Sequence, residues 1–425
     1  MKKILLHSGM SPFDNPTIGE VLINKYSIGS NLGNLMYANS VARTILTNDT
    51  DIVSTYYRYD YTDDEIDEIN STYDCFIIPL ADAFRNDYIS QLNKLTEIIN
   101  RLTIPCIVIG VGLRADYDQK NLTYTFDDDV KRFVNAVLNK SSKLGLRGAF
   151  TGQYLEKLGF IEEKDYTVIG CPSLFINDGN LNIKQLKKKD LLLSLNATLL
   201  GEERVRDFFL QSIENAFDSS IVLQLDTEMR HYYLGKYMTI QKNAKRIPRT
   251  LYGEDTYLKL YRMNKVISFS NIHTWISYLG TRDLSINTRF HGSVASIIAG
   301  IPTIVIPIDS RMKELADYHK LTTIEPDSLI QHSDLNYWIE KLDFKSCEKV
   351  SIQNFRHYLD FLNANGIDSI YENGVRIQES KYDKKIGAIP WIFEASFDQV
   401  SAVEKLRRII NVYSPSIKKS IRGFI

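Results

Sequence analysis

The stretch 284–320 decides the fold of this chain and reads LSINTRFHGSVASIIAGIPTIVIPIDSRMKELADYHK. Its first four residues predict a short strand, and the small residues that follow predict a helix over about 293–299. Gly300 stands where a helix ends, because glycine adopts the left-handed conformation at low cost. The β-branched run 301–308 predicts a buried parallel strand, and a further helix begins at about Met312. This order of strands and helices indicates an α/β domain with a parallel sheet.

The charged residues of this stretch stand where its strands end. Arg289 and His291 follow the first strand, and Asp309, Ser310 and Arg311 follow the second. Ligands of open α/β sheets bind at the carboxyl ends of the strands. An arginine there adds its charge to the positive end of a helix dipole, which suits a phosphate or a carboxylate. His291 can donate a proton or a hydrogen bond to the same ligand. A structural ion pair for Arg289 and a buried role for His291 are the alternative.

A second segment, 141–160, repeats the arrangement. A short strand ends at Arg147, Gly148 follows, and a helix over about 149–158 comes next. Because the two segments are far apart in the sequence, we expect them in different domains. Arg147 and Arg289 are then expected to face each other across a cleft and to meet around one compact trianion.

Several motifs in this order resemble the polysaccharide pyruvyl transferase family. They are LRGAFT (146–151), IGCPS (169–173), TRFHGS (288–293), AGIPT (299–303) and DSR (309–311), and NLGN (31–34) fits as well. The similarity spans about residues 28–320. The resemblance implies an α/β fold in which two Rossmann-like domains face each other across a cleft, as in the glycosyltransferase-B type. It also implies transfer of a pyruvyl group from phosphoenolpyruvate to a sugar of a polysaccharide or its precursor, with ketal formation and release of phosphate.

The resemblance also assigns roles to residues. His291, Arg289 and Arg147 match positions at which relatives bind phosphoenolpyruvate, and we expect them to be catalytic. Arg311 matches a further basic position, where relatives often carry lysine. The other residues predicted to bind substrate are Gly292, Ser293, Asn31, Gly33, Asn34 and Gly112.

Asn34 departs from the family pattern, because relatives usually have aspartate there. If that aspartate serves them as a base, this chain must find its base elsewhere. The alternative role for Asn34 is to cap the helix predicted over 34–46, a position that asparagine favours. Glu228, Arg230 and His231 follow another predicted strand end and indicate a solvated loop, with contact to the acceptor as the second interpretation.

A length of 425 residues favours two domains. We expect an N-terminal Rossmann-like domain over 1–178 and a C-terminal one over 190–345, which carries the TRFHG motif. The polar stretch 177–190 is the expected linker. Residues 346–425 are expected to form a helical C-terminal extension. Gly110-x-Gly112-x-x-Ala115 matches a dinucleotide fingerprint formally, but a glycine-rich turn lining the cleft is favoured because no first strand precedes it.

Composition narrows the class of partner. The formal net charge of −1 gives no field that would favour nucleic acid. Four cysteines without a C-x-x-C pair indicate reduced thiols in a cytoplasmic protein. Residues 1–7 predict a first strand rather than a secretory signal. No cluster of residues has the spacing of metal ligands, so we expect neither metal nor cofactor, with phosphoenolpyruvate as the donor substrate.

The end of the chain is basic and amphipathic. We expect it to pack against the body of the protein or to stay solvated; contact with the inner face of the membrane is the alternative. The acceptor sugar is expected to be lipid-linked or nucleotide-linked, and a homo-oligomer is left open. The basic residues of this tail are Lys405, Arg407, Arg408, Lys418, Lys419 and Arg422.

Two other functions compete with pyruvyl transfer. One is a nucleotide-sugar glycosyltransferase of the same fold, whose diphosphate would use the same arginines. The other is a non-catalytic member of a complex that assembles an exopolysaccharide or a capsule, which Asn34 and the unassigned tail suggest.

Overall fold

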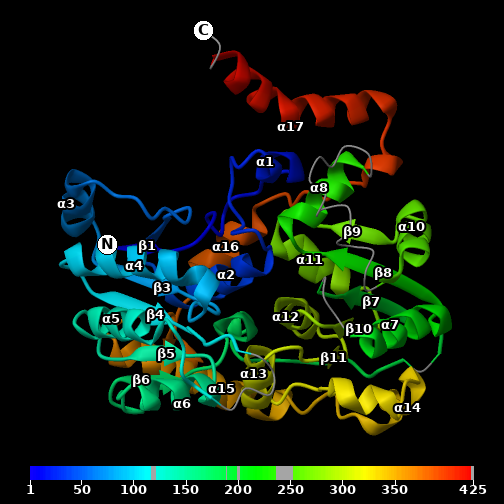
Figure 1. Cartoon of the computed structure of the whole chain (residues 1–425). Coiled ribbons are helices and arrows are strands. Elements are labelled where there is room, and N and C mark those ends of the chain that lie inside the picture. The colour runs from blue at the N-terminus through cyan, green and yellow to red at the C-terminus, as the bar shows by residue number, and fades with distance from the viewer. Residues whose placement is uncertain (116–120, 188, 199–201, 236–251, 423–425) are drawn as a thin grey trace.

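A computed structural model of the chain describes residues 1–115, 121–187, 189–198, 202–235 and 252–422, with side chains described up to residue 414. Figure 1 shows two α/β domains side by side, the N-terminal one in blue to teal and the C-terminal one in green to yellow. The prediction of two Rossmann-like domains of the glycosyltransferase-B type is confirmed.

The N-terminal domain is built on a parallel sheet in the order β2-β1-β3-β4. Every residue of β3 and β4 is buried, as expected for parallel strands covered on both faces. A parallel pair, β5 and β6, continues the sheet through a bridge between Val111 and Leu146. The strands are β1 (Lys2–Leu6), β2 (Thr50–Ser54), β3 (Cys75–Pro79), β4 (Cys106–Ile109), β5 (Leu144–Leu146) and β6 (Tyr166–Val168).

Helices cover both faces of this sheet. They are α1 (Ile18–Leu22), α2 (Gly33–Ile45), α3 (Asp63–Thr72), η1 (Asn86–Tyr88), α4 (Ile89–Arg101), α5 (Asp127–Leu138), α6 (Ala149–Lys157) and η2 (Pro172–Phe175). Helix α2 starts one residue earlier than the sequence predicts, and α6 starts where expected, directly after Gly148.

The C-terminal domain is built on a parallel sheet in the order β11-β10-β7-β8-β9. Its strands are β7 (Leu192–Asn196), β8 (Asp218–Leu223), β9 (Val266–Ser268), β10 (Leu284–Asn287) and β11 (Thr303–Val305). Its helices are α7 (Glu203–Asn215), α8 (Asp226–Leu234), α10 (Glu254–Arg262), α11 (Ile272–Leu279), α12 (Phe290–Ile298), α13 (Ser310–His319), η3 (Pro326–Ile330) and α14 (Leu335–Lys341).

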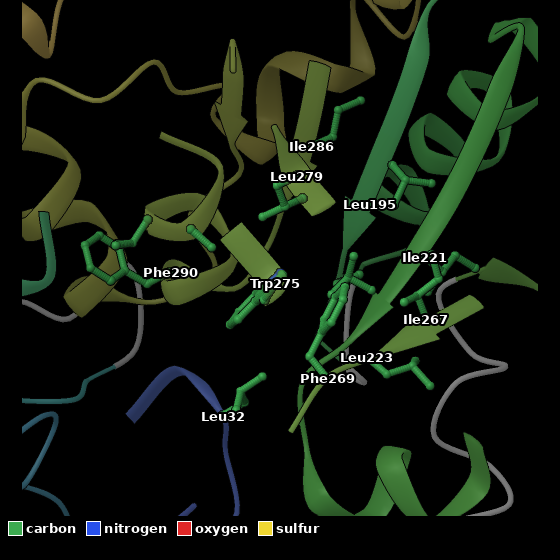
Figure 2. Close-up of a cluster of buried hydrophobic side chains, with 14 of the residues drawn as sticks. Leu32, Leu195, Ile221, Leu223, Ile267, Phe269, Trp275, Leu279, Ile286 and Phe290 are labelled. Atoms are coloured by element: carbon green, nitrogen blue, oxygen red, sulfur yellow. The ribbon is translucent and has the colours of Figure 1, made fainter. Parts of the chain in front are cut away.

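The core of this domain reaches into its neighbour. Side chains from strands and helices, among them Ile221, Ile286 and Trp275, pack into one buried cluster. Leu32, which precedes α2 in the N-terminal domain, is fully buried in the same cluster, and Figure 2 shows it on the side of Trp275 and Phe290. The two domains are therefore packed together near the start of α2.

The C-terminal extension divides into two parts. The first comprises α15 (Glu348–Ala364), β12 (Tyr371–Glu372), β13 (Val375–Arg376) and α16 (Lys381–Gly387). Its apolar side chains, such as Phe355 and Tyr358, share a core with Ile4 and Leu6 of β1, and α15 and α16 lie within the N-terminal domain in Figure 1. This part completes the N-terminal domain.

The second part is η4 (Phe397–Gln399) and the long helix α17 (Ala402–Arg422), which lies along the upper edge of the molecule in Figure 1. Helix α17 packs against α1 and α8, with Val412 buried there. Its outward face carries Val403, Leu406 and Ile410, which are 79%, 58% and 53% exposed. No helix in the described part of the chain is long and apolar enough to cross a membrane.

Two expectations about the deciding stretch need correction. The predicted strand 301–308 is short, with β11 covering only Thr303–Val305. Pro302 and Pro307 flank it, and proline cannot donate a backbone hydrogen bond. Helix α12 begins at Phe290, earlier than expected, so that His291 lies in its first turn. Gly300 has a φ of 76° directly after the helix, as predicted.

Candidate active site

The domains meet where the first turns of α2 and α12 face each other. A Cβ atom at Gly33 would lie 2.4 Å from His291 Cβ and 2.7 Å from His291 Nδ1, so only glycine allows this approach. Just before Gly33, the Leu32 amide donates to the Gln224 carbonyl at 3.0 Å. Gly33 therefore fixes how closely His291 approaches the N-terminal domain.

Arg147 follows β5 and is held in place by the N-terminal domain. Its side chain is 1% exposed, and its Nε donates to the Gly110 carbonyl at 2.8 Å. The guanidinium lies over the Tyr37 ring, 5.5 Å from the ring centre. Its Nη2 is buried and has no hydrogen-bond partner among the residues that the structure describes. A guanidinium that is held in position and has a hydrogen-bond donor without a partner is suited to bind an anion.

Arg311 begins α13 and reaches across to the N-terminal domain. Its Nη1 donates to Asp82 at 3.0 Å and its Nη2 to Asp309 at 3.1 Å. Asp82 follows β3 and also accepts from Arg85 at 3.2 Å, while Arg114 lies 3.8 Å away. The Asp82–Arg311 ion pair joins the two domains.

Four arginines surround Asp82. Burial alone would raise the pKa of Asp82, but the charges of Arg311, Arg85, Arg147 and Arg114 hold this pKa well below its ordinary value. The carboxylate therefore stays ionised, and positive charge exceeds negative charge around it. The Nε of Arg311, like Nη2 of Arg147, is buried without a hydrogen-bond partner in the described residues.

His291 belongs to the same group. Burial, and then the charges of Arg147 and Arg311, lower its pKa to about 3, against an opposing effect of Asp82. The imidazole is therefore neutral near pH 7, and its buried Nε2 has no hydrogen-bond partner within the described ranges. We use the name interdomain cluster for the set Asp82, Arg85, Arg114, Arg147, His291 and Arg311.

Arg289 lies in a different place from the one that the sequence predicts. Its Nη1 and Nη2 donate to the two carboxylate oxygens of Glu228 at 2.8 and 2.6 Å, and both side chains are buried. This ion pair is the alternative that the sequence leaves open. Arg147 and Arg311 therefore lie together around Asp82, while the Arg289 guanidinium forms its ion pair with Glu228. A direct contact of Arg289 with substrate stays a prediction.

Glu228 and its neighbours also correct an expectation. Residues 228–231 lie in helix α8 and not in a solvated loop. Glu228 accepts from the backbone amides of Gln224 and Leu225 at 2.9 and 3.0 Å as well as from Arg289. Its carboxylate holds the chain before α8 and orients Arg289.

Asn31 and Asn34 organise the loop before α2. Asn31 Oδ1 accepts from the Gly33 amide at 2.8 Å and from Gln224 Nε2 at 2.5 Å, which links the two domains. Asn34 Nδ2 donates to the carbonyls of Ile28 and Gly29 at 3.3 and 3.0 Å. The capping position of α2 is Leu32, so the alternative role of Asn34, to cap this helix, is wrong.

Two glycines near the cluster let the larger side chains beside them approach the backbone closely. A Cβ atom at Gly112 would lie 3.0 Å from Arg147 Cδ, and one at Gly292 would lie 2.8 Å from the Asn196 side chain. Ser293 is buried inside α12, and its hydroxyl donates to the Arg289 carbonyl at 3.4 Å. Binding of substrate by Gly292 and Ser293 stays a prediction.

Sequence reasoning misses Asp82, Arg85 and Arg114 as members of the cluster. Asp82 and Arg85 follow the buried strand β3, and Arg114 follows β4. Charge after a buried strand is the signal that singles out Arg289, and the same signal points to these residues. In the described residues, no three His, Cys, Asp or Glu side chains are grouped as metal ligands.

Comparison with known proteins gives one family. A family model described as polysaccharide pyruvyl transferase matches residues 31–310, a range that includes every member of the interdomain cluster except Arg311. No curated protein matches the chain.

Solved structures resemble it only distantly. UDP-GlcNAc 2-epimerase from Neisseria meningitidis bound to UDP-GlcNAc has a TM-score of 0.43 and 10% identity, over 85% of this chain and 100% of that one. S. aureus MnaA with UDP has a TM-score of 0.43 and 9% identity, over 85% of this chain and 98% of that one.

Proposed function

This chain belongs to the polysaccharide pyruvyl transferase family, and on that premise we propose that it transfers a pyruvyl group from phosphoenolpyruvate to a sugar of a polysaccharide or its precursor. The product is a ketal, and inorganic phosphate is released. The observation that carries this proposal is the interdomain cluster, in which arginines from both domains converge and keep donors that have no partner among the described residues.

The donor suits the cluster by charge and by shape. Phosphoenolpyruvate carries a phosphate and a carboxylate, and planar guanidinium groups bind both with paired hydrogen bonds. Arg147 and Arg311 supply these groups from opposite domains, and Asp82 keeps Arg311 in position. Arg114 has a side chain that is 47% exposed, so it can attract the anion from solution.

His291 serves as partner of the phosphate. The nearby negative charge of a bound trianion raises the pKa of the imidazole, which burial and the two arginines hold at about 3 in the free protein. With a raised pKa, Nε2 can donate to a phosphate oxygen and deliver a proton as the phosphate leaves.

The reaction balances without a further reactant. The methylene carbon takes up a proton, the neighbouring carbon becomes oxocarbenium-like, and an acceptor hydroxyl oxygen forms a bond to it. The bond to the phosphate oxygen breaks, and a second hydroxyl closes the ketal. The two hydroxyl protons end on the new methyl group and on the phosphate. Arg147 and Arg311 stabilise the charge that develops on the leaving phosphate.

Thermal unfolding with ligands tests this function. We expect phosphoenolpyruvate at about a hundredfold its Kd to stabilise the chain by about 2.7 kcal/mol. Arg147→Ala and Arg311→Ala should lose most of this effect. Arg132→Ala is the matched control, because Arg132 is an exposed arginine on α5 that pairs with Asp129. Stabilisation by nucleotide-sugars with none by phosphoenolpyruvate would contradict the proposal and favour a glycosyltransferase.

A further inference from the structure

Glu314 is a buried carboxylate at the domain junction that the mechanism above does not use. It lies on α13 of the C-terminal domain, but its partners belong to α6 of the N-terminal domain. The Thr151 amide donates to Oε2 at 2.9 Å, and the Thr151 hydroxyl donates to Oε1 at 2.9 Å. The residue is 6% exposed. Its carboxylate is therefore fixed by the first turn of α6.

Glu314 adjoins the interdomain cluster. A Cβ atom at Gly112 would lie 3.0 Å from Arg147 Cδ and 3.4 Å from Glu314 Oε1, so one methyl-sized position touches both side chains. A Cβ atom at Gly148 would lie 2.7 Å from Glu314 Oε2. These two glycines let the carboxylate approach the base of the Arg147 side chain.

On its other side, Glu314 lines a groove between α6 and α13. The groove has a volume of about 550 Å³, within the range of small-molecule sites. Its walls carry the rings of Phe150 and Tyr318, together with polar groups from Gln153, Lys313 and Asp317. Aromatic faces beside hydrogen-bonding side chains match the alternating C–H and hydroxyl faces of a sugar ring.

We propose that this α6–α13 groove binds the acceptor sugar and that Glu314 is the base that removes the proton from the attacking hydroxyl. The inference rests on the proposed function, because the interdomain cluster must hold the donor on the other side of Glu314. Asn34 cannot supply this base, since its side chain is an amide and is bonded to the loop before α2.

The proton passes from the acceptor oxygen to Glu314 as that oxygen forms its bond to the central carbon of the pyruvyl group. Burial raises the pKa of Glu314 to about 7, against hydrogen bonds from Thr151 and the charge of Arg147, while the charge of Asp309 adds to the rise. A carboxylate with this pKa can take the hydroxyl proton and release it within one turnover, so that this proton ends on the departing phosphate and the carboxylate is free again. The charged groups around it are thus Arg147 and Asp309, with Glu162, Lys313 and Asp317 in the groove.

Glu314→Gln tests the role of the carboxylate, because the amide keeps its size and one acceptor oxygen. The measurement is phosphate release from phosphoenolpyruvate in the presence of a panel of nucleotide-linked sugars and methyl glycosides. We expect sugar-dependent release to fall at least 100-fold. The Kd for phosphoenolpyruvate, measured by thermal unfolding, should stay within a few-fold of the wild-type value. The kcat/KM of the wild type should rise with pH through about 7. Glu314→Asp should recover part of the activity.

The outcomes separate the two proposals. Wild type that neither binds phosphoenolpyruvate nor releases phosphate would overturn the proposed function. Active wild type with an equally active Glu314→Gln variant would overturn the role of Glu314 alone. Phe150→Ala and Tyr318→Ala test the groove, and we expect each to raise KM for the sugar several-fold while KM for phosphoenolpyruvate stays unchanged. An unchanged KM for the sugar in both variants would place the acceptor elsewhere.

Discussion

The partner carboxylate that each arginine meets decides its role at the residue scale. Arg289 is bound at both ends of its guanidinium by Glu228. Arg311 instead shares Asp82 with other arginines, and its Nε has no partner in the part of the chain that the structure describes. The sequence places both arginines after parallel strands and thus at the same edge of the sheet. It cannot show which carboxylate is nearest, because Glu228 and Asp82 come from distant segments.

Replacing Arg289 should therefore affect stability first. We expect Arg289→Ala to lower the free energy of unfolding by about 3–5 kcal/mol, because it leaves Glu228 buried and unpaired. Denaturant unfolding measures this loss. The double variant Arg289→Met with Glu228→Leu should recover most of it, since both charges are then removed. A single variant as stable as wild type would show that this ion pair is not what holds Glu228.

The raised pKa of Glu314 predicts a pH-dependent stability. The folded chain favours the protonated form of Glu314. Its contribution to the free energy of unfolding is therefore complete below the unfolded pKa of about 4.3 and is lost as pH rises through about 7. We expect the stability of wild type relative to Glu314→Gln to fall by about 3 kcal/mol between pH 4.5 and 7. His291, with its lowered pKa, acts in the opposite direction in both proteins, so the comparison cancels it. A pH-independent difference would mean that Glu314 titrates normally.

Helix starts place the candidate site at the element scale. Helices α2, α6, α12 and α13 all begin at the domain junction, and Gly33, Thr151, His291 and Arg311 lie in their first turns. The sequence predicts these elements well, because Gly148 and Gly300 mark boundaries and β10 alternates Leu284 and Ile286 with small polar residues. It misses the length of β11 because two prolines interrupt the apolar run, and it misses the start of α12 because no capping residue announces it.

The contact of α2 with α12 gives a prediction for a glycine. Gly33→Ala should push His291 away, because the new Cβ would lie 2.4 Å from His291 Cβ and 2.6 Å from Cγ of its ring. We expect a fall of several degrees in Tm and loss of stabilisation by phosphoenolpyruvate. Gly387→Ala is the matched control, since no described residue beyond its own helix turn places an atom within 4 Å of its Cβ position. Equal behaviour of the two variants would show that the junction tolerates a shift of His291.

At the scale of the whole molecule, the two domains are tied together by contacts that lie far apart in sequence. Asp82 with Arg311, Thr151 with Glu314, and Asn31 with Gln224 each join one domain to the other. The sequence predicts two domains and the order of their motifs. It does not predict that α15 and α16 return to complete the N-terminal domain, because an apolar helix face does not identify the domain against which it packs.

One exposed face of α17 is apolar, and contact of this face with a membrane stays a prediction. Val403, Leu406 and Ile410 are exposed on one face, and basic residues continue to the end of the helix. We expect the full chain to sediment with vesicles that contain anionic lipid and to bind neutral vesicles less. Replacing the three apolar residues with serine should abolish sedimentation. Equal recovery with anionic vesicles before and after these substitutions would contradict the prediction.

The central claim is that the interdomain cluster holds the donor between the two domains. A crystal structure of the chain with phosphoenolpyruvate tests it most directly. We predict the phosphate or the carboxylate within hydrogen-bond distance of Arg147 Nη2, Arg311 and His291 Nε2, with Arg289 still bound to Glu228. Density for the ligand at the Arg289–Glu228 pair, or at a site that contacts neither Arg147 nor Arg311, would contradict the account.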